Sequence, residues 1–119
     1  MNLSLLKRTV GDAIVLDVRG RITFGDECNF LRKEVKELLA TKPSAVVLNL
    51  SQVSYVDSGG IGTLVALYTS AHGQGCELKL ASPNDKVKHV LEITKLSPIL
   101  GVCPSEEHAI SELPRRASA

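Results

Sequence analysis

The segment Ala45–Leu50, with the sequence A-V-V-L-N-L, limits the possible folds more than any other part of the chain. The run is nearly all apolar, is too short for a helix and is rich in Val and Leu, which is typical of a central strand covered on both faces. A strand of this kind needs helices above or below its sheet. The sequence therefore predicts an α/β fold in which helices pack against a sheet that contains this strand.

The other segments supply the partners of this strand. Alternating apolar and polar residues around a Gly11-Asp12 turn predict an N-terminal hairpin of Leu3–Val10 and Ala13–Arg19. Periodicity and capping signals predict further strands at Glu77–Ala81 and Ile99–Val102, and helices at Asp26–Ala40, Ser58–Ala71, Asn84–Lys95 and from Ser105 onward. We expect Ser82 to cap the third helix. The order of elements implies a mixed β-sheet with helical crossovers, in a single α/β domain with about four helices.

Length and charge limit the domain organisation and the partners. A chain of 119 residues is the size of one compact domain, which we expect to span 1–113, with a flexible C-terminal tail at 114–119. Fourteen Lys and Arg residues against thirteen Asp and Glu residues give a net charge of +1, which offers no electrostatic footprint for nucleic acid or an anionic membrane. We therefore expect a protein partner, with no nucleic acid and no membrane.

The cellular location follows from the N-terminus and the cysteines. Met1–Val10 lacks the long apolar run and cleavage site of a signal peptide, and no segment reaches the length of a membrane span. Cys28, Cys76 and Cys103 are odd in number and lack C-x-x-C spacing, so they predict buried thiols in a reducing compartment. We expect a cytoplasmic protein.

The spacing of the histidines in the sequence does not indicate a metal centre. His72, His89 and His108 fall on three separate predicted helices, and no carboxylate or cysteine was found at ligand spacing from them. Each is interpreted as a solvent-facing or helix-end residue. We expect no metal and no cofactor.

The segment Val53–Leu64, V-S-Y-V-D-S-G-G-I-G-T-L, is the main candidate for a functional site. It lies between the buried strand and the second helix, where open α/β sheets usually hold their sites. We expect Ser58 to cap this helix. Gly59, Gly60 and Gly62 fall in its first turn and cost up to about 1 kcal/mol each relative to Ala. Residues this small would let another backbone, a phosphate or a kinase active site approach Ser58.

A phosphate on Ser58 would act as an electrostatic switch. It would bring about 1.5 to 2 negative charges beside Asp57. The free N–H groups of the helix terminus favour such a charge, whereas the neighbouring carboxylate repels it. The modification could therefore block a partner without refolding the domain.

The longer segment V-L-N-L-S-Q-V-S-Y-V-D-S-G-G-I-G-T-L resembles the signature of the anti-sigma factor antagonist (STAS domain) family. The resemblance extends to Gly20–Thr23 and to Cys76–Leu100, so it covers most of the chain. Two positions depart from it, because many members carry an acid where Thr23 stands and a second Ser or Thr where Gly59 stands. The resemblance implies a STAS-like fold and leaves Ser58 as the one acceptor at this site.

The resemblance also implies a partner-switching function. In the family, the serine at the position of Ser58 is phosphorylated by an anti-sigma factor with serine kinase activity and is dephosphorylated by a serine phosphatase. The unphosphorylated antagonist binds the anti-sigma factor and releases the sigma factor. We expect no enzymatic activity, and we expect the partner to contact Thr23, Asp26, Asp57, Ser58, Gly59, Gly60 and Ile61.

The same residues allow several other interpretations. D-S-G-G could be a plain helix cap with glycines for close packing. The nucleophile motifs of trypsin-like proteases and esterases both fail at Val56. A receiver domain phosphorylated on Asp57 would need an acidic pair and a late Lys that the chain lacks. A non-phosphorylated STAS scaffold domain of a signalling or transport complex remains the alternative function.

Overall fold

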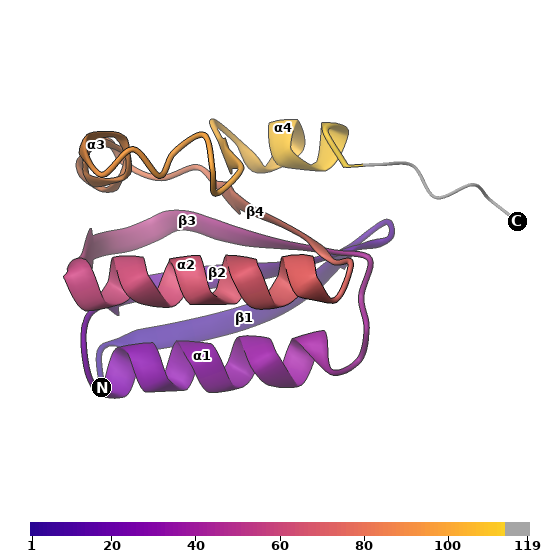
Figure 1. The fold of residues 1–119 in the computed structure, drawn as a ribbon, viewed down its shortest axis with the longest axis horizontal. Helices are drawn as coiled ribbons and strands as arrows, with labels where there is room; N and C mark the ends of the chain where they lie inside the picture. The colour runs from indigo at the N-terminus through magenta and orange to yellow at the C-terminus, as the bar shows by residue number, and fades with distance from the viewer. Residues whose placement is uncertain (114–119) are drawn as a thin grey trace, which may run out of the picture.

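The computed structural model describes residues 1–113 (Figure 1). Its strands are β1 (Leu3–Val10), β2 (Ala13–Ile22), β3 (Ala45–Val56), β4 (Glu77–Ala81) and β5 (Val102–Cys103). Its helices are α1 (Asp26–Leu39), α2 (Ser58–Gly73), α3 (Asp85–Ile93) and α4 (Glu106–Ser111). The tail predicted at 114–119 lies outside the described residues, so the domain boundary at 113 stays a prediction.

The strands form one mixed sheet in the order β1-β2-β3-β4-β5. β1 and β2 pair antiparallel as the predicted hairpin, and the other neighbouring strands pair parallel. The predicted central strand lies in the middle of the sheet, where Val46, Val47 and Leu48 are completely buried. The predicted α/β fold with an N-terminal hairpin and four helices is confirmed.

Helices cover both faces of the sheet. α1 and α2 lie side by side against one face, and α4 lies against the other (Figure 1). Successive residues of a strand point to opposite faces. Val46 and Leu48 accordingly pack with α1 and α2 in the main core, whereas Val47 joins Ala109 in the smaller core under α4.

β3 is longer than the sequence predicted. It continues past Leu50 to Val56 because Arg19–Ile22 of β2 pairs with its second half. Two register shifts interrupt this pairing, so the buried residues Val53 and Val56 are separated by two exposed residues. The strand consequently delivers the chain directly to the start of α2, with Asp57 alone between them.

The predicted last strand and the predicted cap of the third helix were wrong. The predicted strand Ile99–Val102 is shifted, because β5 is Val102–Cys103. The predicted cap Ser82 has a left-handed backbone with φ of 57°, and Asn84 caps α3 by accepting the Val87 N–H at 2.8 Å. The amide oxygen of Asn84 satisfies a free helix N–H, which is the task that Ser82 was expected to perform.

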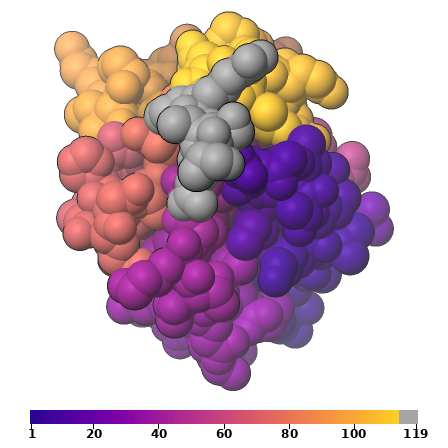
Figure 2. Space-filling view, turned by 90° about the vertical axis from the view of Figure 1, so that its right-hand side faces the viewer, coloured from indigo at the N-terminus to yellow at the C-terminus, as the bar shows by residue number. Residues whose placement is uncertain are grey.

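A charged network attaches α4 to the sheet. Arg8 on β1 donates to Asp17 on β2, with Nε 2.6 Å from Oδ2, and also binds Glu106 at the start of α4. Asn49 on β3 donates to the same Glu106 carboxylate at 3.0 Å. Figure 2 views the molecule from the right-hand side of Figure 1 and shows α4 in yellow above the indigo N-terminal strands.

The cysteines and the helices bear on the predicted cellular location. Cys28, Cys76 and Cys103 are buried free thiols, as expected. None of the described helices combines the length and apolar character needed to cross a bilayer.

Candidate functional site

Ser58 is the first residue of α2 and is exposed. The prediction that it caps the helix was wrong. The cap is Asp57, which has an extended backbone and accepts the Gly60 N–H on Oδ1 at 2.8 Å. Both residues carry an oxygen suited to capping, and the backbone conformation at the end of β3 assigns the task to the aspartate. The Ser58 side chain therefore stands at the surface of the first turn.

Asp57 also binds the loop between β2 and α1. The backbone N–H of Phe24 donates to its carboxylate, at 3.0 Å from Oδ2 and 3.2 Å from Oδ1. Hydrogen bonds from the backbones of Phe24 and Gly60 lower the pKa of Asp57 below its usual value. The carboxylate next to Ser58 is therefore charged at neutral pH.

The glycines of the first turn were predicted to leave space for a partner or a phosphate, but two of them face other parts of this chain. A Cβ on Gly60 would collide with the carbonyl oxygen of Ile22 and lie 2.7 Å from Val56 Cγ1. A Cβ on Gly59 would lie 2.8 Å from Cβ of Phe24, whereas one on Gly62 would meet no atom within 4 Å. The groups that come close to Gly59 and Gly60 therefore belong to this chain, namely Phe24 and Ile22, and not to a partner. Of the three glycines, Gly62 alone has open space beside it.

The predicted partner-binding residues come together at this end of the molecule, but they are not equally accessible. Asp26 is exposed in the first turn of α1, and Thr23 is half-buried and donates to Glu27 Oε1 at 3.3 Å. Gly60 and Ile61 are buried. These two residues support the surface from beneath and offer a partner little contact area.

Phe24 is a surface residue that the sequence analysis missed. It is 82% exposed, and it lies against Gly59 in the loop held by Asp57. Its signal in the sequence was weak but present, because it is one of two Phe residues in the chain and stands between Thr23 and Gly25. Aromatic residues, Phe included, are enriched in protein interfaces relative to the rest of the protein surface.

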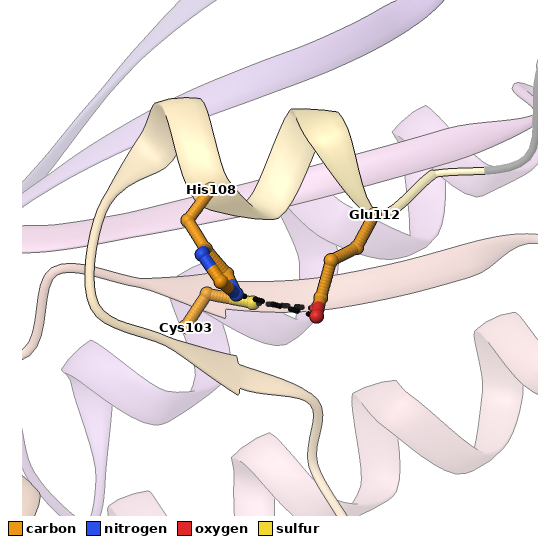
Figure 3. A group of neighbouring side chains, drawn as sticks. All are labelled: Cys103, His108 and Glu112. Atoms are coloured by element: carbon orange, nitrogen blue, oxygen red, sulfur yellow. Dashed lines mark hydrogen bonds and ion pairs between the residues drawn. The ribbon is translucent and has the colours of Figure 1, made fainter.

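A second group of side chains lies on the other face of the sheet. Cys103 of β5, His108 of α4 and Glu112 just after α4 converge, with their potential ligand atoms within 4.8 Å of one another (Figure 3). The prediction that no cysteine or carboxylate lies at ligand spacing from a histidine is therefore wrong at His108. His72 on α2 and His89 on α3 are exposed, and neither belongs to this group.

A family model and a characterised relative both match this chain. The family model of the STAS domain matches residues 4–109. An anti-sigma-B factor antagonist of Listeria monocytogenes is 35% identical over 71 residues, which are 59% of this chain and 62% of that protein.

Solved structures share the fold. A crystal structure of an anti-sigma factor antagonist from Mycobacterium paratuberculosis superposes with a TM-score of 0.83, at 20% identity over 93% of each chain. The Bacillus cell fate determinant SpoIIAA in its phosphorylated form superposes with a TM-score of 0.69, at 17% identity over 93% of this chain and 100% of that one. With a family model that matches nearly the whole described chain and a fold shared with these structures, this protein belongs to the STAS domain family.

Proposed function

We propose that this protein is an anti-sigma factor antagonist that binds an anti-sigma factor and thereby releases a sigma factor. The observation that carries the proposal is the position of Ser58, exposed at the start of α2 beside a charged Asp57 and an exposed Phe24. We call the surface formed by Thr23, Phe24, Asp26, Asp57, Ser58 and Gly59 the Ser58 surface. The names of the Listeria relative and of the Mycobacterium structure support this function.

Phosphorylation of Ser58 by an anti-sigma factor with serine kinase activity turns this contact off. The phosphate adds about 1.5 to 2 negative charges next to the Asp57 carboxylate. It also competes with that carboxylate for the free N–H groups at the start of α2. A surface that combines the apolar Phe24 with the acidic residues Asp26 and Asp57 becomes much more strongly anionic, and a serine phosphatase restores it. A protein of the same fold, SpoIIAA, is known in a phosphorylated form, which supports the proposal that a member of this fold can carry a phosphate.

The proposed acceptor can be tested by intact-mass analysis. The purified protein is incubated with ATP and each candidate anti-sigma kinase of the same genome, in parallel with Ser58→Ala and with Ser4→Ala. Ser4 is an exposed serine on β1 and serves as the matched control. We expect one phosphate on wild type and on Ser4→Ala and none on Ser58→Ala. If no kinase adds a phosphate, the switch is refuted and the scaffold alternative takes its place.

The charge mechanism needs a separate binding measurement. Ser58→Asp adds a negative charge, and Ser58→Asn has a similar shape without the charge. We expect Ser58→Asp to bind the anti-sigma factor at least tenfold more weakly than Ser58→Asn, because like charges at the site of contact oppose binding. Equal binding of the two variants would contradict a mechanism based on charge.

A further inference from the structure

We propose that Cys103, His108 and Glu112 form a binding site for one divalent ion of the zinc class. We call this group the α4 cluster. Figure 3 shows the three side chains directed toward one another in the space between β5 and α4, with Glu112 in contact with both of its neighbours. This inference rests on the α4 cluster alone and is independent of the function proposed for the Ser58 surface.

The distances within the α4 cluster suit a tetrahedral ion. Bond lengths of about 2.3 Å from zinc to sulfur and about 2.0 to 2.1 Å to nitrogen or oxygen, at tetrahedral angles, place neighbouring ligand atoms about 3.3 to 3.6 Å apart. Cys103 Sγ lies 3.4 Å from Glu112 Oε1, and His108 Nε2 lies 3.2 Å from Glu112 Oε2. The two distances end on different oxygens of Glu112, so a small rotation of this exposed carboxylate would bring one oxygen to both neighbours, and the three potential ligand atoms already lie within 4.8 Å of one another.

The ligand types select the kind of ion. A thiolate, an imidazole and a carboxylate together favour a borderline ion such as Zn²⁺ or Co²⁺ over Mg²⁺ or Ca²⁺, which prefer oxygen ligands alone. The side chains of His108 and Glu112 are 47% and 49% exposed, so water can reach a fourth position. The Cys103 thiol now donates to Glu112. The ion replaces that thiol proton, which passes to solvent.

Local structure holds the ligands in this arrangement. His108 and Glu112 are four residues apart, so they lie on one side of α4. Ser105 caps this helix by accepting the His108 N–H at 3.0 Å, and the buried Ala109 packs in the same small core as Cys103, which holds the helix against the sheet. A bound ion would therefore join the short helix α4 to Cys103 of β5.

Lys79 lies beside the α4 cluster and opposes the ion. Its Nζ lies 3.5 Å from Glu112 Oε1, and its side chain is 15% exposed. The ammonium group neutralises the carboxylate in the absence of an ion and would repel a divalent ion in its presence. Lys79 should therefore weaken the site, and its removal should strengthen it.

Cobalt titration of the full-length, reduced chain without a polyhistidine tag tests the site. We expect one Co²⁺ per chain, with thiolate-to-cobalt charge-transfer absorption and the visible bands of tetrahedral cobalt, and displacement by Zn²⁺. Cys103→Ser should lose the charge-transfer band, and His108→Ala and Glu112→Gln should each weaken binding at least tenfold. His89→Ala and Cys76→Ala, which change residues outside the α4 cluster, should bind as wild type does.

Specific outcomes would overturn the proposal. Absence of the charge-transfer band in wild type, its persistence in Cys103→Ser, or equal weakening by His89→Ala and His108→Ala would each exclude the α4 cluster. Lys79→Met should bind Co²⁺ at least several-fold more tightly, and weaker binding would contradict the assigned geometry. Because the titration uses no anti-sigma factor, failure of the Ser58 switch leaves these results unaffected.

Discussion

Asp57 and Phe24 are joined across 33 residues of sequence by hydrogen bonds from one backbone N–H to both oxygens of one carboxylate. The same carboxylate caps α2 through Gly60. One side chain thus fixes both the start of the helix that carries Ser58 and the loop that carries Phe24. The two halves of the Ser58 surface are therefore positioned by a single residue.

Replacement of Asp57 should separate these two halves. We expect Asp57→Ala to lower the free energy of unfolding by about 1 to 2 kcal/mol, the usual effect of removing a helix cap. Asp57→Asn keeps an acceptor oxygen and should recover most of the loss. Urea denaturation measures the change, and Glu37→Ala, which removes an exposed acid of α1, is the control. If Asp57→Ala is as stable as Glu37→Ala, the hydrogen bonds of this carboxylate do not hold the site together.

Two glycines of the same turn should respond in opposite directions to the same change. A methyl group on Gly60 would collide with the Ile22 carbonyl, so Gly60→Ala should destabilise the fold by about 1 to 3 kcal/mol. A methyl group on Gly62 meets no atom within 4 Å, so Gly62→Ala should stabilise α2 by about 0.5 to 1 kcal/mol. Thermal or urea denaturation compares the two. Equal effects would show that the contact with β2 does not require glycine.

The sequence predicted those parts of the fold whose residues follow a regular period. The apolar run at Ala45–Leu50 and the stripe of α2 identified a buried strand followed by a helix, and hence the position of Ser58. The second half of β3 was missed because its buried residues, Val53 and Val56, are three apart and not two. That spacing comes from register shifts in the pairing with β2, which no local pattern records.

The candidate sites were harder to predict because they depend on tertiary placement. Asp57 and Ser58 both have capping oxygens, and the end of β3 decides which one is used. The sequence predicts Cys103 only as a buried thiol, and its proximity to His108 and Glu112 arises because β5 ends at Cys103 and α4 folds back over it. The spacing Cys-x₄-His-x₃-Glu was the signal that the sequence contained.

The charged network under α4 should make stability depend on acid pH. Arg8 lowers the pKa values of Asp17 and Glu106 through hydrogen bonds. Carboxyls with lowered folded-state pKa values contribute stability above their usual pKa values, and this stability is lost as the pH falls through the folded-state values. The free energy of unfolding should therefore decrease from about pH 5 downward.

Replacement of Arg8 isolates this contribution. In Arg8→Met the two carboxyls lose their partner, so the decrease in stability below pH 5 should become shallower, and stability at pH 7 should be lower than in wild type. Urea denaturation at pH 7, 5, 4 and 3 measures both effects. Lys33→Met removes an exposed charge on α1 and should leave the pH profile unchanged. Parallel profiles for wild type and Arg8→Met would contradict the assigned role of Arg8.

Phe24 should contribute to binding and not to folding. Its side chain is 82% exposed, so Phe24→Ala should change the free energy of unfolding by less than about 0.5 kcal/mol. The same truncation should weaken binding of the anti-sigma factor at least tenfold, because burying a Phe side chain in an interface contributes about 1.5 to 3 kcal/mol. Leu6→Ala, which removes an apolar side chain that is 63% exposed on β1, is the control.

The neighbouring Gly59 gives an independent test of this role. A side chain at position 59 would meet Cβ of Phe24, so Gly59→Ser should displace the ring from its position without removing it. If Phe24 acts as an anchor that must be correctly placed, Gly59→Ser and Phe24→Ala should weaken binding to a similar degree, and the double variant should be little worse than either, because both changes affect one contact. Additive losses of binding energy would mean that the two residues contact the partner separately. Unchanged binding in Phe24→Ala would show that the ring takes no part in binding the anti-sigma factor.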